Sequence, residues 1–391
     1  MDSHIIDATA QLLVLLFGSE REAIHKLFNT SDAPQRDRDE LRAMKYAPGY
    51  QLTLSLFSGD ANNNVRDWEI QAAIKDQVKP FVRSIADISE FVIETQVQHY
   101  ATLTAAPALD ASRREYYLMP ESLPNFINTA EWSLASTVST YPSLNFLLYV
   151  PSPKDQPLVV RDAEGNNLAS NAFLIPRWGG IAILNHRSDS QSSPTATISK
   201  AELEPVIGTM LSQLRELLGF PDLAHPKNGR LAAAFPVTFH KSHHKSRKPT
   251  MWELDHVMRR RIAENIVDSS STLASLARLV KSTTNMVVLD HLQDEVTGAL
   301  KDLISACQQL HQPDQGYRQA LAKSKEALVR SEAAFFDPTM VSMLYFPDEH
   351  KYAIYMPLFV PISVPLVMAL LREIKKLKQE RVKDNEKQKE E

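Results

Sequence analysis

The chain has 391 residues, 43% hydrophobic and 23% charged, which is enough to bury a sizeable core. Its 43 Lys and Arg against 47 Asp and Glu give a net charge of −4. That balance disfavours a general nucleic-acid-binding protein, because such binding depends on cations that neutralise phosphates. The single cysteine, Cys307, excludes an internal disulfide.

The first half of the chain mixes predicted helices and strands. Helical periodicity covers residues 4–45, and apolar residues recur at helical spacing from 68 to 85. Leucines alternating with polar residues predict a half-buried strand over residues 50–57. The turn chemistry of residues 164–167 predicts a hairpin between the apolar segments 158–161 and 172–175. Further strands are predicted at residues 91–100, 144–150 and 181–184, with 144–150 a candidate central strand.

The second half is predicted to be helical. An amphipathic helix over residues 201–219 ends at Gly219, a residue suited to a helix C-terminus. A loop rich in Pro, His and Lys follows at 221–250. Strands interleaved with helices indicate an α/β (mixed α+β) fold with a layer of long helices. We therefore expect a mixed α/β domain at 1–250 and a helical segment at 251–351, with helices over residues 252–283, 287–311 and 316–335.

Residues 352–371, YAIYMPLFVPISVPLVMALL, contain no charge and are long enough to cross a bilayer as a helix. A buried core helix is the alternative, but it would normally have a polar stripe. The charged tail 372–391 begins with an excess of Arg and Lys, and the positive-inside rule places such a tail in the cytosol. The bulk of the chain is then expected on the other side of the membrane.

Pro357, Pro361 and Pro365 are spaced by four within this segment and share one face of the predicted helix. Each proline lacks an N–H, so the carbonyl four residues earlier loses its donor. A bilayer supplies no water to replace that donor. We therefore hypothesise that this face of the membrane span packs against partner helices.

Candidate catalytic and metal-binding residues are few. Cys307 and His311 lie four residues apart on one helix, but Cys307 falls in an apolar stripe, which favours burial over nucleophilic catalysis. That stripe comprises Leu292, Val296, Leu300, Leu303, Ile304, Cys307 and Leu310. No catalytic residue is assigned.

His240, His243 and His244 stand among lysines that repel cations, so a solvated basic loop is favoured over a metal site. Together with the run Arg259–Arg261 this loop is a candidate contact for anionic lipid, although solvation is favoured again. No phosphate-binding loop occurs; the glycines after Arg177-Trp178 indicate a tight turn with the indole packed beneath it. We expect no metal and no cofactor.

Asn29-Thr30-Ser31 is the only N-glycosylation sequon in the chain, so Asn29 is the one candidate acceptor. It follows a predicted helix and lies beside a polar segment, where an attached glycan is sterically reasonable. Glycosylation of Asn29 would place the domain in a lumenal compartment.

Several long blocks of the chain resemble the PIG-S family of glycosylphosphatidylinositol (GPI) transamidase subunits. The clearest is EAAFFDPTMVSMLYFPDEHKYAIYMPLFVPISVPLVMALL at 332–371. The others are GYQLTLSLF at 49–57 with Trp68-Glu69-Ile70, LPNFINTAEWSLASTVSTYPSLNFLLYVP at 123–151, AFLIPRWGGI at 172–181, and Met251–Leu254 with the helix that follows.

The resemblance implies a lumenal domain in the endoplasmic reticulum, anchored in its membrane, within a complex that attaches GPI anchors to proteins. Implied partners are PIG-T, PIG-U, the GPI anchor attachment subunit and PIG-K, which carries the cysteine-protease-like catalysis; contact with the GPI lipid is indirect. The implied role is a non-catalytic scaffold. A tail-anchored adaptor facing the cytosol stays an alternative, because the family's first membrane span has no counterpart here. A stand-alone hydrolase or transferase is a weaker one.

Overall fold

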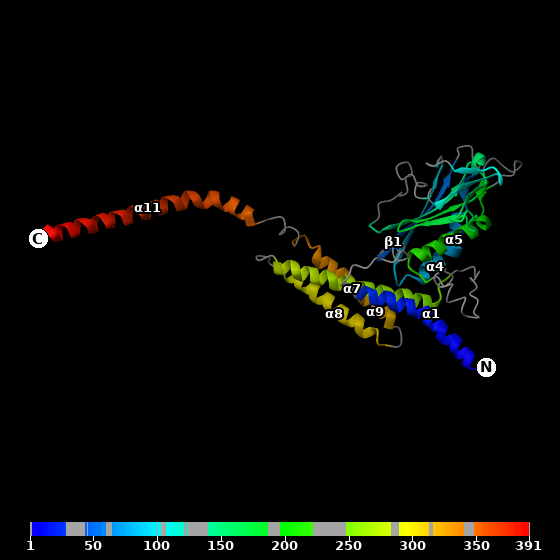
Figure 1. Cartoon of the computed structure of the whole chain (residues 1–391), viewed down its shortest axis with the longest axis horizontal. Helices are drawn as coiled ribbons and strands as arrows, with labels where there is room; N and C mark the ends of the chain where they lie inside the picture. The colour runs from blue at the N-terminus through cyan, green and yellow to red at the C-terminus, as the bar shows by residue number, and fades with distance from the viewer. Residues whose placement is uncertain are drawn as a thin grey trace. The chain divides into compact units, whose positions relative to one another are not determined.

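The computed structural model forms two compact units, Met1–Ser271 with Gly298–Val329 and Thr272–Thr297 with Arg330–Glu391 (Figure 1). The structure describes residues 2–28, 44, 46–59, 65–99, 101, 103, 107–120, 123, 140–186, 196–221, 248–282, 289–312, 316–339 and 348–390. The division into domains at 250, 351 and 371 stays a prediction.

A five-stranded sheet lies at the centre of the first unit, with strand order β3-β1-β6-β9-β8. Neighbouring strands run parallel except β8, which is antiparallel to β9. The predicted strands at 50–57, 91–100, 144–150 and 181–184 are confirmed, and the one at 144–150 is the central strand. The five strands are β1 (Gly49–Ser58), β3 (Glu90–Gln98), β6 (Ser143–Val150), β8 (Ala172–Ile175) and β9 (Gly179–Ile183).

Both faces of this sheet are covered by hydrophobic cores. Along β6, Phe146 and Leu148 pack into a core shared with the helices, while Leu147 and Tyr149 pack into a core shared with other strands. The alternation follows because successive side chains of a strand point to opposite faces. One hydrophobic residue after another in β6 is therefore buried, as expected for a parallel strand covered on both sides.

The prediction that β1 is half-buried is wrong, since all ten residues from Gly49 to Ser58 are buried. Its leucines face the helices, as the alternation predicted, but its polar residues are also covered. Gln51 donates a hydrogen bond to the Glu94 carboxylate at 2.6 Å, and Gln96 donates to the Ser55 hydroxyl at 2.9 Å. These bonds from β3 satisfy polar groups that would otherwise be costly to bury.

The predicted hairpin of 158–161 with 172–175 is also wrong. Residues 158–160 form β7, which pairs in parallel with β5 (Glu115–Leu118) in a three-stranded sheet completed by β4 (Ala108–Asp110). Segment 172–175 instead becomes β8 of the central sheet. The turn at 164–167 exists, with Gly165 at φ +83°, but it closes only a single bridge between Arg161 and Asn167. Turn residues alone did not specify which strands pair.

The β8–β9 turn is the tight turn predicted at 177–180. Arg177 and Gly179 both have positive φ, at 61° and 152°. A Cβ on Gly179 would lie 1.7 Å from the carbonyl oxygen of Asn145, so glycine is required where β9 approaches β6. Trp178 is partly buried against the core on the strand-covered face, in agreement with the predicted packing of the indole.

The helical run after Trp68 is interrupted. Trp68 itself ends the short strand β2 (Val65–Trp68), which pairs with β10 (Ala196–Ile198), so its assignment to a helix was wrong. The helix begins at Ile70 as α3 (Ile70–Ala73), passes through a π-helical turn (Ile74–Val78) and continues as α4 (Lys79–Ser84). Pro80 lacks an N–H for the preceding turn, which explains a departure from α geometry here.

Helix α5 (Lys200–Leu217) packs on the sheet where the 201–219 helix was predicted. Ser199 and Glu202 form a reciprocal capping box at its start, and Gly219, at φ +80°, follows its end. Gln213 donates a hydrogen bond to the Phe173 carbonyl at 2.9 Å, which ties α5 to β8.

The long helices are α1 (Asp2–Phe28), α7 (Met251–Ser282), α8 (Asp290–Gln309), α9 (Gly316–Phe335) and α11 (Asp348–Glu390). They confirm the predicted helices at 252–283, 287–311 and 316–335. The predicted helix at 4–45 is confirmed to residue 28, and residues 29–43 lie outside the described residues. Of the predicted loop at 221–250, residues 222–247 lie outside the described residues, and the others are neither helix nor strand. Sheets, long helices and the apolar helix α11 together confirm the mixed α/β class.

Candidate functional site

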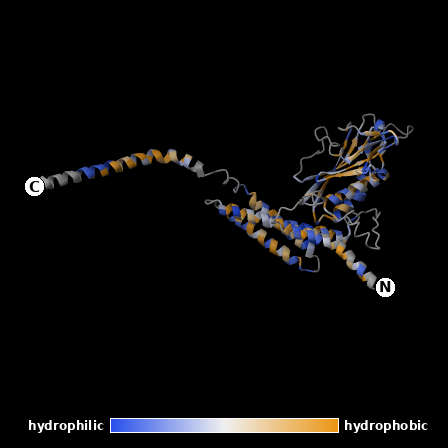
Figure 2. Cartoon of the chain, in the orientation of Figure 1, coloured by the Kyte–Doolittle hydropathy of each residue, from blue (hydrophilic) through white to orange (hydrophobic). Residues whose placement is uncertain are grey.

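Helix α11 carries the predicted membrane segment on one continuous helix. Its stretch Tyr352–Gln379 is long and apolar enough to cross a membrane, and none of its most hydrophobic window is buried inside the protein. Figure 2 shows most of this stretch in orange and its C-terminal part in blue, the colour of hydrophilic residues. Side chains such as Leu358 and Phe359 are 67% and 62% exposed. The alternative of a buried core helix is therefore wrong for the described residues.

The three prolines lie inside α11, which Figure 1 draws as one uninterrupted helix. Because proline has no N–H, the carbonyls of Ala353, Pro357 and Pro361 receive no bond from the residue four positions later. Ser363 does not replace those donors, because its hydroxyl donates to the carbonyl of Phe359 at 2.7 Å. The proline face therefore offers acceptors that the helix itself leaves unpaired.

Cys307 lies on the surface of α8, so its predicted burial is wrong. The stripe predicted to be apolar and buried splits between two faces: Leu292 and Leu303 are buried, whereas Leu300 and Ile304 are 48% and 58% exposed. Buried alanines at 299 and 306 show which face packs inward. The inward face of α8 therefore combines these alanines with Leu292 and Leu303, a combination that the choice of long apolar side chains alone did not predict.

The arrangement of Cys307 and His311 does not form a nucleophile–base pair. The His311 ring nitrogen Nδ1 lies 3.0 Å from the backbone carbonyl oxygen of Cys307, not from a sulfur. Contact between a thiol and a base is what activates a cysteine nucleophile. The contact between the His311 ring and the Cys307 carbonyl instead lies at the C-terminal end of α8.

A buried ion-pair cluster joins α1 to α7, and sequence reasoning did not find it. The Glu20 carboxylate is 3.0 Å from Nδ1 of His256 and accepts hydrogen bonds from Arg259 Nε at 2.5 Å and Nη2 at 2.8 Å. The Arg259 guanidinium also lies over the rings of Phe17 and Tyr317. Burial would raise the pKa of Glu20, but the hydrogen bonds and charges of Arg259 and His256 lower it to about 2.

The basic run 259–261 is engaged within the protein. Arg260 Nε pairs with Glu264 at 2.9 Å. Arg261 is buried, pairs with the same carboxylate at 2.5 Å and donates to the Leu218 carbonyl at the end of α5. These three arginines therefore do not form a free lipid-binding patch. They also do more than solvate the start of a helix, which is the interpretation that the sequence favours. The histidines at 240, 243 and 244 lie outside the described residues.

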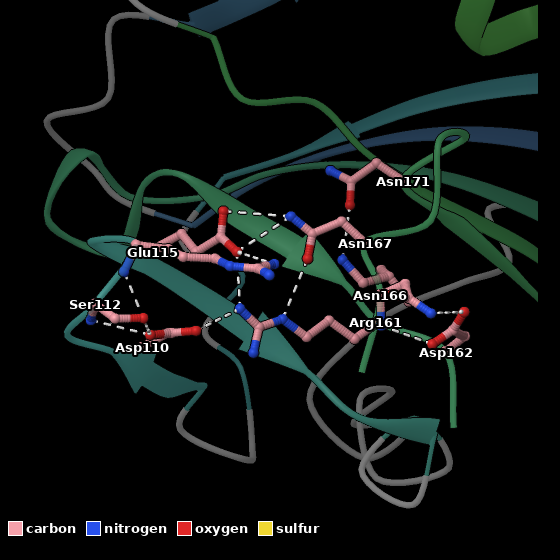
Figure 3. Close-up of polar contacts among 10 residues, drawn as sticks. Asp110, Ser112, Glu115, Arg161, Asp162, Asn166, Asn167 and Asn171 are labelled. Carbon is pink, nitrogen blue, oxygen red and sulfur yellow. Dashed lines mark hydrogen bonds and ion pairs between the residues drawn. The ribbon is translucent and has the colours of Figure 1, made fainter. Parts of the chain in front are cut away.

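A second polar cluster surrounds Arg161 beside the three-stranded sheet (Figure 3). Its guanidinium donates to Asp110 at 2.7 Å, Glu115 at 2.8 Å and Asn167 at 3.2 Å. It also lies 4.1 Å from the centre of the Tyr117 ring. The pKa of Asp110 is lowered most by its hydrogen bond from Ser112 and next by its hydrogen bond from Arg161. The cation is already surrounded by its partners, so this cluster joins strands and turns.

Among the described residues, no three His, Cys, Asp or Glu side chains converge as a metal site requires. Asn29 lies outside the described residues, immediately after the last residue of α1. In the polar clusters that the structure describes, the charged groups are paired with one another, whereas the apolar surface of α11 is exposed. These features define the class: a membrane-associated mixed α/β protein.

The chain belongs to the PIG-S family, because the model of that family, phosphatidylinositol-glycan biosynthesis class S protein, matches residues 2–380. It is 36% identical over 337 residues to the Bos taurus GPI-anchor transamidase component PIGS, and 35% over 336 residues to that of Homo sapiens. Each alignment covers 85% of this chain and 58% of the relative.

A fungal relative gives the same assignment. The Schizosaccharomyces pombe GPI transamidase component PIG-S homolog is 32% identical over 355 residues, which is 90% of this chain and 58% of the relative. The chain thus spans less than two thirds of the length of these relatives. The family resemblance drawn from the sequence blocks is confirmed.

Proposed function

We propose that this chain is a subunit of a GPI transamidase, the membrane complex that attaches GPI anchors to proteins, and that it acts as a scaffold. The observation that carries the proposal is the match to the family over residues 2–380, together with relatives named as GPI transamidase components. In this role the chain contributes binding surfaces that hold other subunits and the lipid substrate in register.

Three features support a role without catalysis. The Cys307 thiol has no contact with the His311 ring among the described interactions, because that ring faces a backbone carbonyl. The carboxylate of Glu20 and the guanidinium of Arg161 are each enclosed by charged partners. A convergent nucleophile, base and oxyanion site would be needed for hydrolysis or acyl transfer.

Replacing Cys307 tests the enzymatic alternative. Cys307→Ser in the complete complex should leave transamidation unchanged, because the side chain is exposed and the substitution is nearly isosteric. Cys307→Ala is the matched variant that removes the polar group as well. A loss of activity in both variants, with the complex still assembled, would contradict the scaffold role.

The proposed partners are the catalytic subunit PIG-K, PIG-T, PIG-U and the GPI anchor attachment subunit. Affinity capture of the tagged chain from a mild detergent extract, followed by mass spectrometry, should recover these proteins together. A parallel capture with an unrelated single-span membrane protein controls for non-specific recovery. Recovery of the chain without the catalytic subunit would sink the proposed function.

The proposed location is the endoplasmic reticulum membrane, with the α/β domain in the lumen and the tail after α11 in the cytosol. The basic residues Arg372, Lys375, Lys376 and Lys378 at one end of the apolar stretch support this orientation. In intact cells Asn29 should then carry a glycan, detected as a mobility shift after endoglycosidase treatment, which Asn29→Gln removes. Digestion of the domain by protease added outside intact microsomes would favour the tail-anchored adaptor.

The proline face of α11 is proposed to pack against helices of these partners. It is exposed along its length, as a helix would be whose neighbours belong to other chains.

A further inference from the structure

The prolines of α11 lie in a single row of residues spaced by four: Ala353, Pro357, Pro361, Pro365 and Ala369. This row carries only compact side chains, and the prolines keep their rings close to the backbone. Bulkier rows flank it on both sides. They are Ile354, Leu358, Ile362, Leu366 and Leu370 on one side, and Met356, Val360, Val364 and Met368 on the other.

A row of compact residues between two bulky rows forms a shallow groove along the helix surface. Residues spaced by four line the ridges and grooves through which helices pack. In membranes, compact residues at this spacing let a second helix approach closely, with a right-handed crossing of about −40°. The flanking side chains are between 46% and 67% exposed, so nothing within the described chain fills the groove.

The second observation is chemical and points to the occupant. The carbonyls of Ala353, Pro357 and Pro361 lie along this same row and lack the helix donor that proline cannot supply. Proline also bends a helix, opening the backbone beside these carbonyls. Lipid tails offer no donor, so lipid alone would leave the acceptors unsatisfied. A helix with hydroxyl, amide or indole donors on its facing side would satisfy them.

We propose that the groove along Ala353–Ala369 holds one transmembrane helix of a partner subunit, which donates side-chain hydrogen bonds to the three carbonyls freed by the prolines. This proposal rests on the proposed function, because it takes the partner to be another subunit of the complex. The partner helix carries donors such as Ser, Thr, Asn or Trp at a spacing of about four residues. The opposite row, containing Phe359, Ser363 and Val367, faces away from it.

Three triple variants of the full chain separate the two halves of this proposal. Pro357→Ala, Pro361→Ala and Pro365→Ala together return N–H donors to the carbonyls and keep the groove compact. The same positions changed to Leu return the donors and also fill the groove. Phe359→Ala, Ser363→Ala and Val367→Ala together form the matched control on the opposite row.

The measurement is photo-crosslinking in native membranes, with a photoreactive residue in place of Ala369, or of Leu371 in the opposite row. The Ala369 probe should crosslink to one partner subunit, and the Leu371 probe should not. Each membrane hydrogen bond is worth roughly threefold in association, so the loss of three bonds in the alanine triple should weaken this crosslink about twenty- to thirtyfold. The leucine triple should weaken it at least as much, and the opposite-row control should leave it unchanged.

Other outcomes overturn the proposal in distinguishable ways. Crosslinks from Ala369 only to lipid, or to a second copy of the chain, would exclude a partner-subunit helix. An alanine triple that crosslinks as well as the unaltered chain would show that the freed carbonyls are not used. In both cases affinity capture of the subunits by the unaltered chain would still uphold the proposed function. Failure of that capture would remove the function and the inference together.

Discussion

The first compact unit, which contains the central sheet, and helix α11 differ in how their polar groups are satisfied. In the first unit Gln51, Glu20 and Arg161 find partners inside the same chain. On α11 the most hydrophobic window is entirely exposed, and three prolines leave backbone acceptors without internal donors. The first region thus pairs these polar groups within the chain, whereas the second leaves an apolar surface and three backbone acceptors exposed.

The largest effect on the stability of the first compact unit is expected at the central strand of its sheet. Phe146 is 1% exposed in β6, and Phe146→Ala should destabilise the domain by about 3–5 kcal/mol, because it leaves a cavity that the packed core cannot close. The expected result is a clear fall in the unfolding temperature, followed by intrinsic fluorescence in detergent. An unchanged unfolding temperature would mean that the core does not depend on this strand.

The cluster at Glu20 should have the next largest effect. Glu20→Gln removes the charge that Arg259 and His256 share, and should cost about 2 kcal/mol. This is less than for a fully buried pair, because Arg259 keeps some contact with water. The unfolding midpoint in urea measures it, and Glu22→Gln on the exposed side of α1 is the matched control. Equal midpoints for the two variants would contradict the role of the cluster.

The same carboxylate predicts a pH dependence. The folded-state pKa of Glu20 is about 2, below its ordinary value of 4.5, so the unfolded chain binds its proton at higher pH than the folded protein does. The stabilisation is therefore complete above about pH 5 and is lost as the pH falls toward 2. Glu20→Gln should flatten the fall in stability over this window. Parallel curves for the variant and the unaltered protein would disprove the assignment.

A smaller effect is expected at Arg161. Arg161→Lys keeps the charge but loses the planar fork that reaches Asp110, Glu115 and Asn167 together. We expect a lower unfolding temperature than for the unaltered protein, with a smaller fall than for Glu20→Gln. Hydrogen exchange should rise locally in β4 and β5. Uniform exchange rates in both proteins would show that the lysine replaces the fork fully.

The smallest effect is expected for the substitution that mirrors Phe146→Ala in the other region. Phe359 is 62% exposed on α11, so Phe359→Ala removes no internal packing of the chain. The free energy of unfolding of the protein should change by less than about 0.5 kcal/mol with this substitution. A loss comparable to that of Phe146→Ala would show that α11 packs against the chain's own core and would end the contrast between the two regions.

Features that depend on local pattern and composition could be predicted from the amino-acid sequence. Periodicity and backbone chemistry account for the apolar, uncharged length of residues 352–371, the spacing of the three prolines, the capped helix ending before Gly219 and four of the five strands of the central sheet. The family was also recognisable from the sequence, because long blocks of residues along the chain resemble that family.

Which segments of the chain meet is a property of the tertiary structure. It sent residues 158–160 and 172–175 into different sheets, covered the polar face of β1 and turned Cys307 to the surface. It also brought Glu20 to His256 and Arg259, more than 230 residues away. Pairing between distant segments depends on the total packing of the core. A local sequence pattern does not specify which distant segment will pack against it.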